Sequence, residues 1–594
     1  MLLKLFPTLT QHPANAARLR GLILQLAVQG KLTAQWRATN PEVESTAVLL
    51  EKIAEEKARL VKEKKIKKEK SLPEITEEEK PFALPEGWAW CRLRDLVSIL
   101  GDGIHGTPQY DDMGNVFFIN GNNLNDGLIN IKPNTKKVSE EEAQKHFKPL
   151  NERTVLVSIN GTIGNTAFYN GERIMLGKSA CYFNLLTDID KEYIRNVLKT
   201  NYFLEHAFKA ATGTTIKNVS LRTMRAFCIP LPPFAEQKAI VAVVEQLLAE
   251  VDQLEAQTQA RQRLQADYLT SALRDLTSAG SVQRTPQPGA PAESSLAQLL
   301  PMVSDAEGVK QLRAAILQLA VQGQLTANWR ANRKSGATTE AHASAGLEVE
   351  SAAVLLEKIA EEKAHMVKEK KIKKEKPLPA ITEEEKPFAL PEGWAWCRLD
   401  DILAVVGGVT KGKKATHDMV TALYLRVANV QRGYLDLEVM KEIVVSKTDF
   451  EKYQLLAEDL LIVEGGDYDK VGRCAIWGNE IKDCIYQNHV FRVRPYQKEG
   501  LSAMFMMQYI NSPDMRRYFE SCSKQTTNLA SINKTQLRSA PLAIPPLEEQ
   551  KAIVEKVDSL MALCDQLEAA LAAGEQQLTQ LMESCVREVV AATP

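Results

Sequence analysis

The chain carries the same blocks of sequence twice, and this internal duplication limits its possible folds more than any other feature. LRGLILQLAVQGKLTAQWR at Leu19–Arg37 returns as LRAAILQLAVQGQLTANWR at Leu312–Arg330. A second block, Ser45–Leu93, returns at Ser351–Leu399 with 44 of 49 positions identical, including KPFALPEGWAWCRL in full. The fold must therefore contain two copies of whatever these blocks build.

A third block closes each repeat. IPLPPFAEQKAIV at Ile229–Val241 is echoed by AIPPLEEQKAIV at Ala543–Val554. Between the second and third blocks lie about 135 to 145 residues in each half, and these show no recognisable identity. The chain thus alternates constant and variable parts, which we expect to have different roles.

These boundaries divide the 594 residues, too many for one core, into five predicted segments. They are an N-terminal conserved helical region at 1–91, a first variable domain at 92–228, a central conserved region at 229–397, a second variable domain at 398–544 and a conserved C-terminal helix at 545–594. The central region holds a Pro, Gly and Ser linker at Ser278–Ser295, and Arg333–Gly346 is a second linker found only in the second copy.

The constant parts are predicted to be helical. Apolar residues in Ser45–Lys70 keep steps of three and four, which gives a helix one apolar stripe. The stripe consists of Leu50, Ile53, Ala54, Ala58 and Val61. Pro73 and Pro81 then end the helix, and the chain enters the tryptophan stretch extended.

Two longer segments have the alternating steps of four and three residues that are typical of coiled coils. The first runs through Ile240, Val244, Leu247, Val251 and Leu254. The second runs through Ile553, Val557, Leu560, Cys564, Leu567, Leu571, Gly574, Leu578, Leu581 and Cys585, where only Gly574 suits the seam poorly. Two such helices in one chain are expected to pair with each other. If Ala235–Leu276 is continuous, it is about 60 Å long at ~1.5 Å per residue.

The variable segments have the mixed pattern of an α+β fold. Short β-like runs lie at Val116–Asn120, Thr154–Ile159, Leu460–Gly465 and Val490–Pro495, among Gly and Asn turns. A helical piece follows in each segment, at Tyr193–Ala211 and at Ala503–Ser521. We therefore predict two α+β domains of similar plan, an internal pseudo-two-fold repeat, and unlike surfaces.

Composition excludes several classes of protein. No apolar run approaches the ~20 residues that cross a bilayer, and nine dispersed cysteines without a C-x-x-C argue for reduced thiols in a cytosol. The net charge of −1 gives no global sign of a nucleic-acid partner. The variable domains are mildly basic, with 17 Lys and Arg against 14 Asp and Glu in the first and 20 against 18 in the second.

The turns of the variable domains are rich in side chains that suit DNA. Asn pairs with adenine edges, Arg and Lys with guanine, and Thr and Lys serve phosphates. The candidate DNA-binding residues of the first domain are Thr107, Tyr110, Asn120, Asn122, Asn123, Asn160, Thr214, Thr215, Lys217 and Asn218. Those of the second are Thr410, Lys411, Lys413, Lys414, Tyr468, Lys470, Arg473, Lys524, Thr526, Thr527 and Asn528. The competing interpretation is that these Gly, Asn and Thr turns are only turns.

Other motifs have simpler explanations. GGVTKGKK at Gly407–Lys414 lacks the Ser or Thr that would hold magnesium in a phosphate-binding loop. The histidines have no metal-ligand spacing, and we predict neither catalytic nor metal-binding residues. Trp88, Trp90, Trp394 and Trp396 are interpreted as core anchors rather than base-stacking platforms. The lysine runs at Lys62–Lys70 and Lys368–Lys376 are either solvated helix faces or contacts to a DNA backbone.

The order of these motifs resembles the specificity subunit of type I restriction–modification systems. LPEGWAWCRL opens a variable domain, IPLPPFAEQKAIV or IPPLEEQKAIVEKVDSLMALCDQLE closes one, and LILQLAVQGKL fits the conserved regions. The resemblance implies two target-recognition domains, held apart by an antiparallel coiled coil of two long conserved helices. Each domain would read one half of a split double-stranded DNA site, and the helices would set the gap.

The resemblance also implies the partners. Two modification subunits would dock on the conserved regions and use S-adenosylmethionine for adenine methylation. Restriction subunits would join them and use ATP and Mg²⁺ for translocation and cleavage. This chain itself would bind no cofactor and catalyse nothing, and it would work in a bacterial or archaeal cytoplasm without a membrane partner.

Two alternatives stay open from the residues alone. The chain could be a self-contained DNA methyltransferase or nuclease, which would act on DNA without partners. It could also be a coiled-coil adaptor that binds no nucleic acid.

Overall fold

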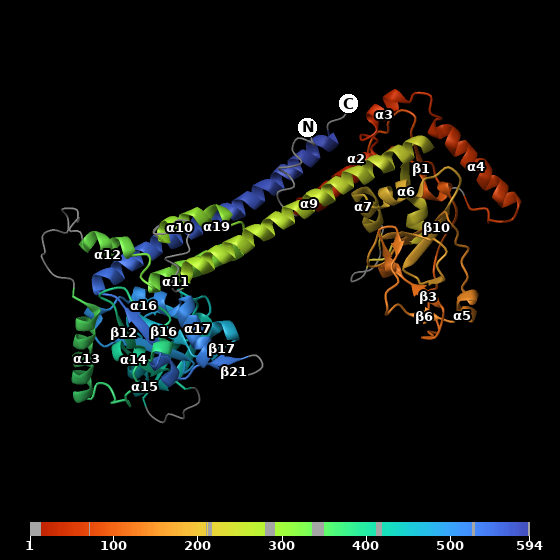
Figure 1. Cartoon of the computed structure of the whole chain (residues 1–594). Helices are drawn as coiled ribbons and strands as arrows, with labels where there is room; N and C mark the ends of the chain where they lie inside the picture. Colours follow the sequence, from red (N-terminus) through yellow and green to blue (C-terminus); the bar gives the residue numbers. More distant parts are fainter. Residues whose placement is uncertain are drawn as a thin grey trace. The chain divides into compact units, whose positions relative to one another are not determined.

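A computed structural model describes residues 14–70, 72–209, 211, 217–278, 292–334, 350–410, 418–525 and 529–591. The chain divides into two compact units, Met1–Arg261 with Glu575–Pro594 and Gln262–Gly574, and each is considered by itself (Figure 1). No helix within the described ranges is long and apolar enough to span a membrane.

The first two repeated blocks build the same helices in both units. In the first unit these are α2 (Ala14–Val28), α3 (Ala34–Thr39) and α4 (Thr46–Lys62). In the second unit α10 (Ala292–Leu299) precedes α11 (Ala306–Val321), α12 (Ala327–Lys334) and α13 (Ala352–Lys368). The duplication is therefore structural as well as sequential.

The prediction for Ser45–Lys70 was wrong in two respects. The helix ends at Lys62 because Lys64 adopts a left-handed backbone conformation with φ 57°, and Lys370 does the same after α13 with φ 59°. Of the predicted stripe only Ile53 is buried; the other buried residues of α4 are Thr46 and Leu49. The helix therefore contacts its unit along a narrow edge.

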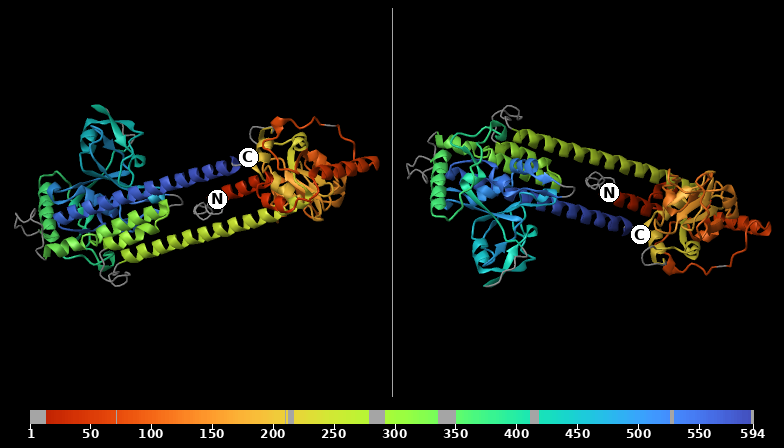
Figure 2. Two further views of the ribbon diagram at one scale, coloured as in Figure 1. Left: turned by 90° about the horizontal axis from the view of Figure 1, so that it is seen from above. Right: turned by 90° about the horizontal axis from the view of Figure 1, so that it is seen from below.

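Two long helices match the predicted heptads. α9 (Phe234–Thr277) has 44 residues and α19 (Leu547–Ala591) has 45, and both are unbroken in Figure 2. Each begins in one unit and ends in the other. In α9 the heptad residues Ile240, Val244 and Val251 are buried, and Leu247 and Leu254 are partly buried in the same hydrophobic cluster.

Towards its C-terminal end, the seam of α19 departs from the prediction. Leu581 is 41% exposed, whereas Met582 is fully buried. An ideal helix of 3.6 residues per turn drifts by ~20° per heptad against a repeat of 3.5. Over the four heptads from Ile553 to Leu581 this drift moves the inward-facing position of α19 to the next residue, Met582.

A short repeated helix joins the seam in each unit, which the sequence analysis did not anticipate. In the first unit Leu19 and Ile23 of α2 share one hydrophobic cluster with Val251 and Met582. The Arg20 guanidinium lies 2.7 Å from the Asp252 carboxylate and also contacts Glu255. In the second unit α11 takes the same role, and Arg313 contacts Asp565 at 2.6 Å and Glu568 at 3.0 Å.

The first variable domain contains a four-stranded sheet in the order β2-β10-β7-β8 and a three-stranded sheet in the order β6-β3-β9. The strands are β1 (Ala89–Arg92), β2 (Val97–Asp102), β3 (Val116–Ile119), β4 (Leu124–Asn125), β5 (Leu128–Ile129), β6 (Lys137–Val138), β7 (Thr154–Ser158), β8 (Thr166–Phe168), β9 (Ile174–Leu176), β10 (Ala180–Leu185) and β11 (Cys228–Leu231). The helices are α5 (Glu140–Lys145), α6 (Lys191–Leu198), α7 (Asn201–Lys209) and α8 (Leu221–Ala226).

The second variable domain has the equivalent sheets β13-β20-β16-β18 and β15-β14-β19. Its strands are β12 (Ala395–Arg398), β13 (Leu403–Gly407), β14 (Met419–Leu425), β15 (Lys441–Ser446), β16 (Asp459–Val463), β17 (Gly465–Gly466), β18 (Cys474–Trp477), β19 (Ile485–Tyr486), β20 (Val490–Pro495), β21 (Lys524–Gln525), β22 (Ala530–Ser531) and β23 (Pro541–Ile544). Its helices are α14 (Leu399–Ile402), α15 (Lys447–Tyr453), α16 (Ala503–Ile510), α17 (Pro513–Cys522) and α18 (Lys534–Arg538). The predicted common α+β plan is confirmed.

The helical piece predicted in each domain is two helices rather than one. The break falls at Thr200 in the first domain, where the hydroxyl donates to the Val197 carbonyl at 2.6 Å. In the second it falls at Ser512, which caps α17 at its N-terminus, and Pro513 follows at the first helical position. A proline fits there because it has no N–H to bond.

The tryptophan stretch and the third block pair at the base of each variable domain. β1 pairs antiparallel with β11, and β12 with β23. Trp88 and Trp394, just before these strands, are 9% and 8% exposed, which confirms them as core anchors. Trp90 and Trp396, within the strands, are only partly buried, and their rings pack against Phe82 and Phe388.

One buried glutamate at the start of each long helix ties three repeated segments together. The Glu236 carboxylate accepts hydrogen bonds from Trp88 Nε1 at 2.8 Å and Thr33 Oγ1 at 2.7 Å, and it pairs with Arg37. Glu549 is bonded in the same way by Trp394 at 2.9 Å, by Thr326 at 2.7 Å and by Arg330. Both glutamates are 1% exposed, so each carboxylate depends on these partners.

The glutamine that follows connects the long helix to the variable domain. Gln237 Oε1 accepts from the Asp190 N–H at 2.8 Å, and Gln550 Oε1 accepts from the Ser502 N–H at 2.9 Å. Asp190 and Ser502 cap α6 and α16. The repeated Glu-Gln pair thus fixes each variable domain to the constant helices.

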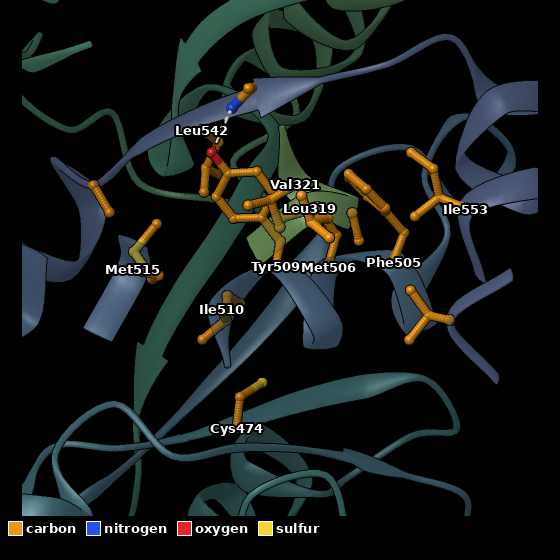
Figure 3. Close-up of a cluster of buried hydrophobic side chains, with 14 of the residues drawn as sticks. Leu319, Val321, Cys474, Phe505, Met506, Tyr509, Ile510, Met515, Leu542 and Ile553 are labelled. Atoms are coloured by element: carbon orange, nitrogen blue, oxygen red, sulfur yellow. Dashed lines mark hydrogen bonds between the residues drawn. The ribbon is translucent and has the colours of Figure 1, made fainter. Parts of the chain in front are cut away.

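The core of the second unit shows how the parts converge. Leu319 and Val321 of α11 lie with Tyr509 of α16, Leu542 of β23 and Ile553 of α19 in one buried cluster (Figure 3). The Tyr509 hydroxyl accepts from the Ala543 N–H at 3.0 Å. The variable domain is therefore packed on the constant helices rather than tethered to them.

Candidate nucleic-acid interface

Two polar loops that lie far apart in the sequence meet in the first variable domain. Asn160, in the loop after β7, forms an antiparallel bridge with Asn218, and its Nδ2 donates to Asn218 Oδ1 at 3.3 Å. The Val219 N–H donates to the Ile159 carbonyl at 2.8 Å. The predicted contact residues Asn160, Lys217 and Asn218 are thus brought together at one place.

The second domain brings the corresponding loops together. β17, after β16, pairs with β22, and β22 pairs in turn with β21, which contains Lys524. The Ile532 N–H donates to the Glu464 carbonyl at 2.9 Å. The loop at 464–473 and the strands β21 and β22 therefore occupy the same place as their counterparts in the first domain.

A further predicted loop, Asn120–Gly127, packs against this meeting point. A Cβ at Gly121 would lie 2.2 Å from Ser158 Oγ, so the two turns touch and only glycine fits. Thr162 Oγ1, from the loop after β7, donates to the Gly121 carbonyl at 3.2 Å. The site is held by hydrogen bonds between turns.

The loop at Gly101–Tyr110 starts beside the same cluster. Gly103 is packed against the Leu176 and Gly177 backbone, and Gly177 in turn lies against Asn120. Farther along, Thr107 is exposed and Tyr110 is 43% exposed, with its ring 5.8 Å from that of Phe118. In the second domain Gly408 is packed in the same way against Tyr486 and Gln487, and Thr410 is exposed.

Some predicted residues serve the turn in which they lie. Asn123 is 8% exposed; its Oδ1 accepts from the Asn120 N–H at 3.0 Å and its Nδ2 donates to the Asn130 carbonyl at 3.1 Å. Asn429 of the second domain makes the equivalent bonds, to the Arg426 N–H and the Asp436 carbonyl. Because Asn123 and Asn429 hold the same turn in both domains, they explain the shared fold of the turn and not a difference in base choice. Asn122, next to Asn123, is exposed.

Two predicted cations of the second domain are already paired within it. Lys470 contacts Asp467, and its hydrogen bond lowers the pKa of that carboxyl. Arg473 contacts Asp469 at 2.5 Å and donates to Gln431 Oε1 at 2.7 Å. These pairs order the loop, and DNA would have to compete with the two aspartates for the cations.

The structure adds two arginines that the sequence analysis missed. Burial, followed by the charges of Arg516 and Arg473, lowers the pKa of Arg432 to about 10. This is still far above neutral pH, so three positive charges lie close together beside the loop at 464–473. No local motif marks this cluster, because Arg432 and Arg516 come from different parts of the domain. Asp469 and Glu520 pair with Arg473 and Arg516, so the cluster has an excess of one positive charge, which favours phosphate.

Several candidates lie outside the described residues: Thr214, Thr215, Lys411, Lys413, Lys414, Thr526, Thr527 and Asn528. The side chain of Tyr468 is likewise not described. Their described neighbours, among them Lys217, Thr410 and Lys524, are exposed.

Over the described part of the chain, no group of three or more His, Cys, Asp or Glu side chains could hold a metal ion. The arrangement instead presents amide, hydroxyl and cationic groups on turns that a rigid scaffold positions. Groups of this kind bind base edges and phosphates.

Comparison with known proteins gives a consistent picture. The family model described as "Type I restriction modification DNA specificity domain" matches twice, at residues 85–261 and 391–574. The Type I restriction enzyme EcoAI specificity subunit of Escherichia coli is 31% identical over 592 residues, which cover 96% of this chain and 92% of the relative. The EcoEI specificity subunit of Escherichia coli is 28% identical over 584 residues, with 96% and 92% covered.

Solved structures with a similar fold include the HsdS subunit from Thermoanaerobacter tengcongensis. It is 15% identical, with 86% of this chain and 98% of that chain covered and a TM-score of 0.41.

Proposed function

Because the chain belongs to the family of type I restriction–modification specificity subunits, we propose that each variable domain reads one half of a bipartite duplex DNA site. The chain is the sequence-recognising, non-catalytic subunit, and partner subunits carry out methylation and cleavage. The first variable domain reads one half-site and the second reads the other.

A single observation supports this division most strongly. Two domains with the same strand order are fixed to matching anchors, yet their polar loops share few residues beyond those that hold the turns, such as Asn123 and Asn429. The Glu236 and Glu549 clusters hold both domains alike. Only the surface formed by the loops is free to differ, as two readers of unlike half-sites require.

The partners follow from the repeat. A chain with two copies of one surface suits two copies of one partner, here the modification subunits. The exposed faces of α4 and α13 are almost identical in sequence and are candidates for such contacts. Restriction subunits would complete the complex. S-adenosylmethionine, ATP and Mg²⁺ would be used by these partners, not by this chain.

The loop residues can be tested by substitution in the assembled complex. Replacing Asn160 and Asn218 with alanine is expected to relax base choice in one half-site, by about 1–3 kcal/mol for each lost bidentate contact, or roughly 5- to 150-fold. The other half-site should be read as before. The measurement is methylation of a randomised duplex library, and Asn134→Ala, in an exposed turn of the same domain, serves as the control. Equal relaxation of both halves would contradict the proposal.

The long helices are proposed to set the unread gap between the half-sites. Deleting residues 258–264 of α9 and the matched residues 571–577 of α19 removes one heptad from each and keeps the seam in phase. At ~1.5 Å per residue this is about 10 Å, or roughly three base pairs at ~3.4 Å each. We expect methylated sites whose half-sites are unchanged but whose gap is shorter. An unchanged gap in an active complex would rule out the spacer role.

A further inference from the structure

The lysine-rich segment KEKKIKKEK follows α4 as Lys62–Lys70 and is repeated without change after α13 as Lys368–Lys376. We refer to the two copies as the lysine straps. Each holds six lysines and two glutamates, and every lysine in both copies is exposed. Beyond the turn at Lys64 or Lys370 the straps are irregular rather than helical.

A glutamate fixes the first strap to the variable domain. Glu69 lies 3.3 Å from Arg225 of α8 and 3.6 Å from Arg94, and Arg94 also donates to the Lys70 carbonyl at 2.5 Å. Helix α8 begins at Leu221, three residues after Asn218. The strap therefore runs beside the helix that leaves the candidate reading loop.

The second strap is fixed in the same place by an equivalent arginine and a new lysine. Glu375 lies 2.7 Å from Lys534 and 3.4 Å from Arg538, both on α18. The hydrogen bond from Lys534 lowers the pKa of Glu375, so the carboxylate is charged at neutral pH. Helix α18 follows β22, which belongs to the second reading loop. The arginine partner is kept as well, because Arg225 and Arg538 each lie three residues before the strand that pairs with the tryptophan stretch, and only the second partner differs.

The helix dipole does not explain these lysines. A cation gains from the dipole only within the last turn of a helix. Lys67, Lys68 and Lys70 lie beyond α4, which ends at Lys62. Because Glu69 is engaged by arginines, it adds little to the neutralisation of the strap lysines. The mutual repulsion of the lysines is relieved most effectively by a polyanion, through the release of its counterions.

The identity of the straps indicates what they bind. The straps are identical whereas the loops beside them share few residues, so the straps cannot explain why the two domains choose different bases. DNA phosphates are the chemical groups that both half-sites share. Resting on the proposed reading function, we propose that each lysine strap binds the phosphate backbone of duplex DNA beside its half-site and adds affinity without specificity.

The test uses the chain assembled with its partner subunits. Lys67, Lys68, Lys373 and Lys374 are replaced with glutamine, and binding is measured on a duplex with the recognised site and on a scrambled duplex between 50 and 200 mM salt. Both affinities should fall about ten-fold or more, by the same factor, and the slope of log affinity against log salt should decrease by about 0.9 for each lost phosphate contact. The map of methylated sites should not change.

The control variant removes the same number of exposed charges elsewhere, at Lys238, Arg263, Lys310 and Lys551, and should leave the salt slope unchanged. Unchanged affinity and slope in the strap variant would overturn the proposal. So would intact DNA binding with weaker assembly, which would assign the straps to an acidic surface of a partner protein. A change in sequence preference in the strap variant would show that the lysine straps contact bases, and this result would also overturn the proposal. If exchange of a variable domain moves no half-site, the reading function fails regardless of the straps.

Discussion

Replacing Glu549 with leucine is expected to lower the free energy of unfolding of the second unit by about 3–5 kcal/mol. The substitution removes the carboxylate that Trp394, Thr326 and Arg330 share. It leaves the partly buried Arg330 guanidinium without its counter-charge and the buried Trp394 N–H without its acceptor. Removing one partner of a buried ion pair costs far more than losing a surface pair, because the remaining charge has no water to solvate it.

Hydrogen exchange of the full chain locates the effect. The amides of β12 and β23, which pair beside this cluster, should exchange about two to three orders of magnitude faster, since each 1.4 kcal/mol corresponds to about ten-fold. The amides of β1 and β11 in the first unit should be unaffected. Glu236→Leu should produce the reverse pattern.

Glu548 provides the matched control, because it precedes Glu549 and its side chain is 53% exposed in a pair with Lys551. Glu548→Ala should change stability by less than about 1 kcal/mol. If Glu549→Leu and Glu548→Ala had the same small effect, the buried cluster would not be the anchor of the domain.

The constant part of the fold was largely predictable from the sequence. Heptad steps over residues 240–254 and 553–585 identify α9 and α19 because the pattern is local, although the helices themselves have 44 and 45 residues. The end of α4 at Lys62 was not predictable in the same way. Lysine and glutamate favour a helix, and only the backbone at Lys64 shows the turn.

The third helix of each seam was missed for a related reason. α2 and α11 have apolar residues over most of their surface, which identifies a buried helix but not the partner against which it packs. Met582 replaced Leu581 in the seam because small differences in helical repeat accumulate along α19.

The candidate site was only partly predictable. The sequence singled out the turns around Asn160 and Asn218, but their pairing joins residues 58 positions apart and follows from the sheet. The sequence pattern did not distinguish Asn123, whose amide holds a turn, from Asn122, which is exposed. The Arg432 cluster likewise could not be predicted from local motifs, because its arginines are far apart in the sequence and meet only in the folded domain.

The most direct test of the two-reader arrangement is to exchange one variable domain. Residues 93–228 are replaced by the corresponding segment of a relative with a different half-site, and the Trp88, Glu236 and Gln237 anchors are retained. The domains share one plan and one set of anchors, so the hybrid should fold and assemble. Methylated adenines are then mapped across a genome for the assembled complexes with the parent and the hybrid chains.

We expect one half of the recognised site to become that of the donor, with the other half and the gap between them unchanged. Each former base pair in the exchanged half should lose about 1–3 kcal/mol of discrimination, so the old site should fall to background. A map in which both halves change, or in which an active hybrid complex keeps the parental site, would contradict the assignment of one half-site to each domain.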